Sequence, residues 1–198
     1  MSMDSAGFCS RLLNVIEHDV IPLTRDGVAA GNKVFGAAIL RKDDLSLVIA
    51  ATNNEIENPL NHGEISTLNA FYRLDPATRP ATADCIFVST HEPCPLCLSA
   101  ITWAGFDNFY YFFGYEDTRD TFDIPHDLRI LQEVFKVENG DYARTNAFWT
   151  CRDIIGMSGG IADAQEERTA QIGRIRAAYD ALSAAYQESK ADNDIPLS

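Results

Sequence analysis

The sequence predicts an α/β protein, because apolar runs of strand length alternate with segments that repeat at the helical period. Residues 34–40 and 45–52 are two apolar runs joined by a polar turn, a pattern that predicts an antiparallel hairpin. Residues 85–89 predict a short, fully buried strand, and residues 106–115 predict a strongly aromatic one. The helical segments lie before, between and after these strands.

Three of the helical segments can be placed in order along the chain. Residues 8–29 carry apolar side chains at helical spacing, and we expect this helix to end near Pro22 or soon after it. Residues 64–74 have the same spacing and stop before a proline. A third helix should begin after Pro93 and continue through Ala104, since proline favours the first turn of a helix.

The segment after the aromatic strand is long enough for a crossover connection. Residues 116–131 contain Pro125, and we expect a short helix from His126. Residues 132–137 are the candidate for the last strand. Because a connection of this length joins parallel strands more readily than a hairpin, we expect the last two strands to be parallel.

The C-terminal part differs in composition from the rest. Residues 156–160 form a Gly-rich break, and an apolar seam then repeats every 3 or 4 residues, formed by Ile172, Ile175, Tyr179, Leu182 and Tyr186. We therefore divide the chain into a domain of residues 1–155 and a C-terminal helix within residues 156–198. The seam fits packing on the same domain or a contact with a neighbouring subunit. Residues 190–198 are expected to fray.

Charge argues against two classes of partner. The 198 residues include 16 Lys and Arg against 29 Asp and Glu, a formal net charge of −13. Such a surface repels a phosphate backbone and an anionic bilayer, so we expect neither nucleic acid nor membrane as a partner. No apolar run approaches the roughly 20 residues of a membrane helix, and the N-terminus has no signal-peptide pattern, so we expect a cytoplasmic protein.

Two short motifs, about 30 residues apart, carry the chemistry: His62-Gly63-Glu64 and Pro93-Cys94-Pro95-Leu96-Cys97. His62, Cys94 and Cys97 supply three zinc ligands, one fewer than a closed structural site. The fourth ligand can be a water, whose pKa the metal lowers toward neutrality, and Glu64 can carry protons from that water to a leaving group. The spacing predicts one hydrolytic zinc ion per active site. We expect His91 and His126 to be packing or surface histidines.

These motifs resemble the zinc signature of the cytidine deaminase-like superfamily, whose members deaminate nucleobases and nucleosides. Residues 35–38 resemble the Phe-Gly-Ala of the family's first strand, and residues 90–101 resemble the cysteine segment of guanine deaminases and tRNA adenosine deaminases. The resemblance covers residues 10–137. It implies a three-layer helix/sheet/helix fold with a mixed five-stranded sheet, beside the long C-terminal helix, and assembly into homodimers or larger homo-oligomers.

The resemblance also implies which residues meet the substrate. Asn53 stands where the family's substrate-binding Asn falls, and Gly63 replaces the common Ala between His and Glu. Trp103 matches guanine deaminases and would lie in the core or in the substrate pocket. Asp123 is the single acid of Phe122-Asp123-Ile124, where guanine deaminases carry Phe-Asp-Asp. Asn53, Gly63, Trp103 and Asp123 are therefore the candidate substrate-binding residues.

The implied reaction is hydrolytic deamination of a small amino-substituted heterocycle. A zinc-bound hydroxide attacks the amino-bearing ring carbon, Glu64 shuttles protons, and ammonia leaves. A guanine-like base ranks first, which would place the protein in purine metabolism, although the missing second Asp weakens this choice; cytosine, adenine and nucleosides stay open. The alternatives are deamination of adenosine in tRNA or single-stranded nucleic acid, and a non-catalytic, zinc-folded interaction module.

Overall fold

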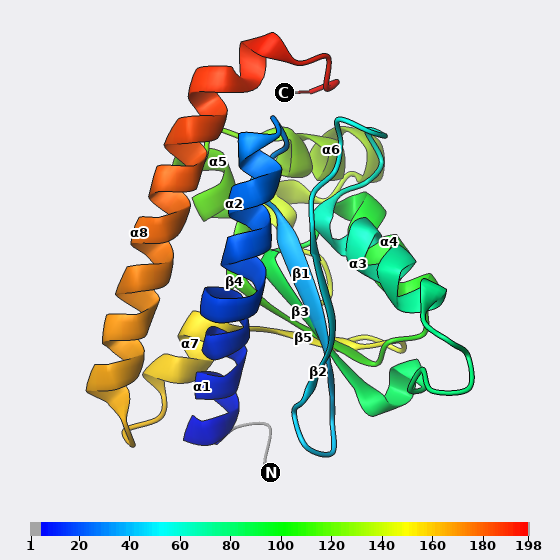
Figure 1. Ribbon diagram of the computed structural model, residues 1–198, viewed down its shortest axis with the longest axis vertical. Coiled ribbons are helices and arrows are strands. Elements are labelled where there is room, and N and C mark those ends of the chain that lie inside the picture. Colours follow the sequence, from blue (N-terminus) through cyan, green and yellow to red (C-terminus); the bar gives the residue numbers. More distant parts are fainter. Residues whose placement is uncertain (1–4, 198) are drawn as a thin grey trace.

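Five strands form one mixed sheet in the computed structural model of the protein, which describes residues 5–197. The strand order is β2-β1-β3-β4-β5, with the bounds β1 Gly36–Arg41, β2 Leu47–Thr52, β3 Cys85–His91, β4 Asn108–Phe113 and β5 Thr150–Asp153. Strand β1 is antiparallel to β2 and β3, whereas β4 is parallel to β3 and β5. Helices cover both faces of this sheet (Figure 1).

The two faces of the sheet carry separate apolar clusters. In β1, Ala38 and Leu40 join one cluster while Ala37 and Ile39 join the other, as the two-residue period of a strand requires. The first cluster is completed by α1 (Ala6–Val15), α2 (Ile21–Ala29) and α8 (Gln165–Ser189), and the second by α3 (Gly63–Arg73) and α4 (Pro95–Trp103). The predicted three-layer α/β class is confirmed.

The first helix continues past the proline where the sequence suggests an end. Residues 16–20 form one π-helical turn, in which the backbone N–H of Ile21 donates to the carbonyl of Ile16. This turn places Pro22 at the start of α2, where a missing N–H costs no helical hydrogen bond. Helix α2 can therefore continue to Ala29.

The last strand lies later in the chain than the sequence predicts. Residues 132–137 belong mostly to α6 (His126–Phe135), whose end is set by the left-handed conformation of Lys136, at φ 59°. The fifth strand is β5, which has four residues and buries only Cys151, so its alternation is too short to detect. Its parallel pairing with β4 agrees with the parallel last pair, and α5 (Tyr115–Asp120) and α6 form the crossover.

Helix α8 packs on this chain's own α1 and α2 (Figure 1). Four residues of the predicted seam are buried in the first apolar cluster, and the fifth is half-buried against it: Ile175, Tyr179, Leu182, Tyr186 and Ile172. The Gly-rich break contains a short helix, α7 (Ile154–Gly159), which the Asp153 carboxylate caps. Short 3₁₀ turns span Thr82–Asp84, Glu138–Gly140 and Lys190–Asp192. Between residues 5 and 197, no helix is both long and apolar enough to cross a membrane.

His91, at the end of β3, is a packing residue. Its ring lies 4.8 Å from the ring centroids of Phe35, Phe113 and Phe122, and 5.4 Å from that of Tyr179 on α8. Burial in this aromatic shell lowers the pKa of His91 to about 3. The imidazole is therefore neutral in the folded protein and links the sheet to the C-terminal helix.

We predict that replacing His91 with Phe reduces the loss of stability in acid. Below about pH 6.5 the unfolded chain binds a proton at this position that the folded chain does not, so the free energy of unfolding falls as the pH falls. This loss amounts to about 1.4 kcal/mol per pH unit. Denaturant unfolding at pH 7 and pH 5 should show a decline about 2 kcal/mol smaller for His91→Phe than for the native chain.

The exposed His18 offers a matched control, because its side chain remains 67% accessible. His18→Gln should lose as much stability between the two pH values as the native chain. An equal decline in His91→Phe would contradict the assignment of this pH dependence to His91.

Candidate active site

Two helices begin at one end of the sheet, and a candidate metal ligand occupies the N-cap of each. His62 directly precedes α3 and Cys94 directly precedes α4, both in extended backbone conformation at the N-cap. Cys97 and Glu64 lie in the first turns of these helices. The N-terminal ends of helices stabilise negative charge, so thiolates and carboxylates are favoured here.

The three predicted ligands form a cluster with the dimensions of a tetrahedral zinc site. The Nδ1 atom of His62 lies 3.4 Å from the Cys94 sulfur and 3.7 Å from the Cys97 sulfur. A zinc ion with ordinary bond lengths and tetrahedral angles would separate such nitrogen and sulfur atoms by about 3.5 Å. All three ligand atoms lie within 4.8 Å of one another. The donor set and its spacing therefore fit zinc.

The protonation of this cluster is set by mutual contacts. Burial works against a charged His62, but hydrogen bonding to Cys94 and to Glu55 prevails and raises the pKa of His62 to about 11. Contact with Cys97, together with His62, lowers the pKa of Cys94 well below its usual range despite burial. Burial and the neighbouring Cys94 raise the pKa of Cys97. A metal ion takes the place of such protons, so its binding here would release them.

Glu64 lies beside this cluster and is fully enclosed. The hydroxyl of Ser89 donates to one carboxylate oxygen of Glu64 at 2.8 Å, and the Cys97 sulfur lies 3.2 Å from the other. Burial and then the charge of Cys94 raise the pKa of Glu64. The carboxyl group can therefore bind and give up a proton next to the metal ligands.

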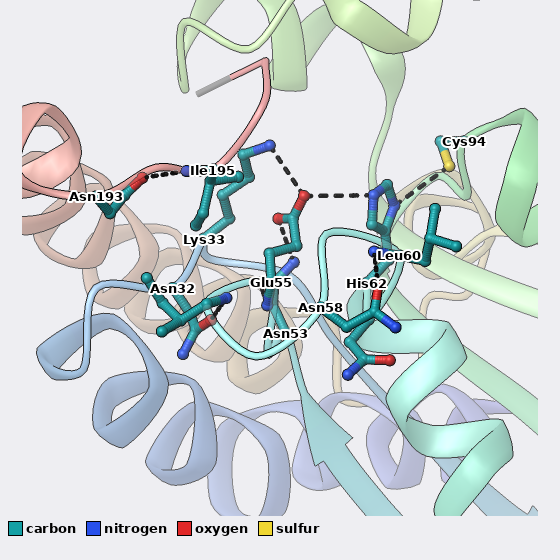
Figure 2. A network of polar contacts seen from close by, with 12 residues as sticks. Asn32, Lys33, Asn53, Glu55, Asn58, Leu60, His62, Cys94, Asn193 and Ile195 are labelled. Carbon is teal, nitrogen blue, oxygen red and sulfur yellow. Dashed lines mark hydrogen bonds and ion pairs between the residues drawn. The ribbon is translucent and has the colours of Figure 1, made fainter.

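A buried carboxylate, Glu55, holds the far side of the His62 ring (Figure 2). One Glu55 oxygen lies 3.5 Å from His62 Nε2 and 3.2 Å from the ammonium of Lys33, and the other accepts a 2.8 Å hydrogen bond from Asn53. A hydrogen bond from Nε2 to a carboxylate fixes the ring tautomer in which Nδ1 is free to bind metal. Glu55 thus orients the imidazole toward the two sulfurs.

A cavity of about 560 Å³ opens onto the ligand cluster and onto Glu64. Its polar lining adds Lys33, Glu55, Glu92, His126 and Asp127 to His62 and Glu64. Its apolar lining includes Phe35, Leu60, Ile124, Ile130, Phe135, Pro196 and Leu197. The volume is in the range of small-molecule sites. Pro196 and Leu197, in the tail that was expected to fray, line part of this cavity.

Asp127, like Lys33 and Glu55, is a cavity residue that was not identified from the sequence. It lies in the first turn of α6, and burial, followed by the charge of Cys94, raises its pKa well above the usual range. Within residues 5–197 its carboxylate has no hydrogen-bond partner, although it lines the cavity. The sequence did contain one indication of Asp127. It is an acidic residue in the first turn of a helix that begins after Pro125, at the end of the sheet where the other candidate residues lie.

All four candidate substrate-binding residues lie outside the lining of this cavity. Trp103 is neither core nor cavity, because its side chain is 90% exposed on the outer face of α4. Asp123 is exposed in a left-handed turn at φ 55° and does not line the cavity. Asn53 is buried but lines a different, polar cavity between α2, β2 and α3, with both ends of its amide bonded to Glu55.

The fourth candidate, Gly63, allows a close approach of two backbones. A Cβ atom at this position would lie 2.7 Å from the carbonyl group of Phe35 and from the backbone nitrogen of Gly36. No real side chain tolerates that separation. Gly63 therefore lets α3 start directly against β1, which sets the position of the neighbouring His62.

We predict that Gly63→Ala weakens both folding and zinc binding. The added methyl group must push α3 away from β1, at a cost of about 1–3 kcal/mol, and His62 moves with the helix start. Denaturant unfolding and competition with a zinc chelator measure the two effects. Gly173→Ala is the matched control, because a methyl group on α8 meets nothing within 4 Å. Equal stability and zinc affinity in Gly63→Ala and the native chain would show that the close approach is not needed.

Comparisons with known proteins agree with this site. The family described as the cytidine and deoxycytidylate deaminase zinc-binding region matches residues 18–113. The guanine deaminase of Bacillus subtilis (strain 168) is 31% identical over 126 residues, which cover 59% of this chain and 72% of that protein.

Two solved structures share the fold. A mutant protein in complex with 8-azaguanine has a TM-score of 0.56 at 20% identity, covering 92% of this chain and 85% of that one. The guanine deaminase from Nitrosomonas europaea has a TM-score of 0.51, also at 20% identity, covering 83% and 84%.

Fold, ligand cluster and relatives together define a zinc-binding hydrolase that acts on C–N bonds. The chain belongs to the cytidine deaminase-like superfamily of zinc-dependent deaminases, within which it is guanine deaminase-like. The predicted family and cofactor are confirmed.

Proposed function

We propose that this protein hydrolytically deaminates a guanine-like amino-heterocycle and releases ammonia. The observation that carries the proposal is the meeting of His62, Cys94 and Cys97 with Glu64 at the inner end of one cavity of about 560 Å³. Three protein ligands leave the fourth zinc ligand to water. When bound, zinc would act as a Lewis acid and make hydroxide available from water near neutral pH.

Glu64 is proposed as the catalytic proton carrier. Its enclosed carboxylate has Ser89 on one oxygen, which leaves the other oxygen to face the ligand cluster. A raised pKa suits a group that must first accept a proton from the attacking water and then deliver it to the substrate. The amino group of the substrate then leaves as ammonia.

Asp127 is proposed as the acid that holds the substrate ring, in place of Asp123. Its carboxylate faces the cavity with no hydrogen-bond partner among residues 5–197, and a ring N–H or amino group is the donor that such a group needs. The acid missing from Phe122-Asp123-Ile124 is thus supplied four residues further along, by α6. This removes the reason for doubting a guanine-like substrate.

The surroundings favour an uncharged base over a nucleotide or a polynucleotide. Four carboxyl groups, those of Glu55, Glu64, Glu92 and Asp127, line the cavity against the single ammonium of Lys33. A phosphate would be repelled there, and the formal net charge of −13 opposes a nucleic acid. A non-catalytic zinc module is disfavoured by the presence of Glu64 and of a cavity that leads to it.

Organisation and assembly are proposed in the same way. Residues 1–155 would form the deaminase domain, with the C-terminal helix docked on it in the same chain. A homodimer or larger homo-oligomer is supported by Trp103 and Tyr72, which are exposed next to each other on α4 and α3, where Tyr72 donates to the carbonyl of Ala104. A cytoplasmic location stays a prediction.

We predict that Glu64→Gln keeps zinc but loses turnover. The amide preserves the size of the side chain and the contact with Ser89, but it cannot carry protons, so kcat should fall by about 10²–10⁴-fold. Ammonia release from guanine and zinc content per chain are the two measurements. One zinc per chain with unchanged ammonia release would overturn the role of Glu64, and no ammonia from guanine, cytosine or adenine in the native protein would overturn the proposed function.

We predict that Asp127→Asn lowers kcat/KM for guanine by about 10- to 100-fold, because the substrate donor loses a carboxyl acceptor. Asp123→Asn is the matched control, since it makes the same chemical change four residues away on an exposed turn. Steady-state kinetics on both variants decide between the two acids. A loss in Asp123→Asn with none in Asp127→Asn would reverse the assignment.

A further inference from the structure

Lys33 is a buried cation in the wall of the active-site cavity. It lies just before β1, and its side chain is only 6% exposed. Lysine is rarely buried to this degree, because removing an ammonium group from water is costly unless it is paired and hydrogen-bonded. A buried ammonium group at this position therefore requires polar partners that offset the loss of water.

Within residues 5–197, Lys33 has one hydrogen-bond partner, Glu55, at 3.2 Å. An ammonium group has three donors, so two N–H groups are left for something in the cavity. Figure 2 shows the Lys33 ammonium at the end of its extended side chain, on the opposite side of Glu55 from the His62 ring. One carboxylate oxygen contacts both groups, so the ammonium lies close to the metal ligands without touching them.

The ammonium suits a ligand atom that accepts hydrogen bonds without carrying a negative charge of its own. Glu55 already balances the charge of Lys33, and Glu64, Glu92 and Asp127 surround the same cavity. A carbonyl oxygen on the ring fits this position, whereas an anion such as phosphate does not. Asn53 cannot take this part, because both ends of its amide are bonded to Glu55.

We infer that Lys33 selects substrates that carry a ring carbonyl group in addition to the amino group that is removed. The inference rests on the proposed function and specifies the substrate class as amino-substituted lactams. Lys33 donates to the carbonyl oxygen while Asp127 accepts from a ring N–H or amino group, so the cavity distinguishes the two edges of the ring. Glu55 acts as a positioning residue that holds the ammonium in place.

An amino group in place of the carbonyl would bring two hydrogen-bond donors, the amino group and the Lys33 ammonium, face to face without an acceptor. A hydrogen in its place would leave the buried N–H groups without a partner. Sites built around a polar partner reject analogues that lack it by large factors, up to about 10⁴–10⁵-fold. We therefore expect the native protein to prefer a carbonyl at this ring position by at least about 100-fold.

The test uses three purines that share the 2-amino group and differ only at carbon 6: guanine with a carbonyl, 2-aminopurine with hydrogen, and 2,6-diaminopurine with an amino group. We would measure kcat/KM for ammonia release with the native zinc protein and with Lys33→Met. The double variant Lys33→Met/Glu55→Gln keeps the pair uncharged in case the single variant does not fold. Lys42→Met is the matched control, because Lys42 lies beyond the other end of β1 and pairs with Asp107.

The expected result is a strong guanine preference in the native protein and in Lys42→Met, reduced to about tenfold or less in the Lys33 variants. Binding of the three purines to zinc-loaded Glu64→Gln, measured by calorimetry, should show the same order without turnover. Equal loss on all three purines in Lys33→Met would assign Lys33 a purely structural role and overturn the inference alone. No turnover and no binding of any purine would overturn the proposed function together with it.

Discussion

The site depends on the convergence of two helix starts at one end of the sheet. Helix α3 can begin against β1 only because residue 63 has no side chain, and this contact carries His62 to its position. Helix α4 begins where β3 ends, and the hydroxyl of Tyr115 fixes the carbonyl of Pro93 at 2.6 Å. The ligand separations follow from these two backbone contacts, so the sheet sets the geometry of the metal site.

Glu92 ties the α4 side of the site to the last strand. Its carboxylate accepts hydrogen bonds from Tyr142, from Arg144 and from the backbone of Tyr115, and the Arg144 contact is 2.8 Å long. Tyr142 and Arg144 belong to the loop that leads into β5. Although β5 is short, it therefore helps to fix the segment that carries Cys94.

The active-site cavity combines buried charges that would each be costly alone. Glu55 is stabilised by Lys33, His62 and Asn53 together, which offsets the loss of water around it. Among the residues that the structure describes, Asp127 has no such partners. The contrast separates a group that the fold itself satisfies from a group that remains available to a ligand.

The candidate zinc ligands and Glu64 could be grouped from the sequence, because each lies at the start of one of two helices that begin at the same end of the sheet. Strands β1, β3 and β4 could also be predicted, because each buries both faces and is therefore a continuous apolar run in the sequence. The exposure of Trp103 could not be predicted, because an aromatic residue on a helix does not itself show whether its face of the helix is buried or open to solvent. The positions of Asp127 and β5 depend on how the crossover connection packs against the sheet. The contacts of Asn53 depend on its hydrogen bonds to Glu55, which only the three-dimensional structure reveals.

The length of α8 has a consequence for how this protein can change during evolution. Its 25 residues extend for roughly 37 Å, and the tail that follows reaches the cavity with Pro196 and Leu197. Removing one turn would shorten the helix by about 5.4 Å and withdraw the tail from the cavity wall. Insertions and deletions in α8 are therefore coupled to the shape of a cavity whose other lining residues lie far earlier in the chain, between Lys33 and Phe135.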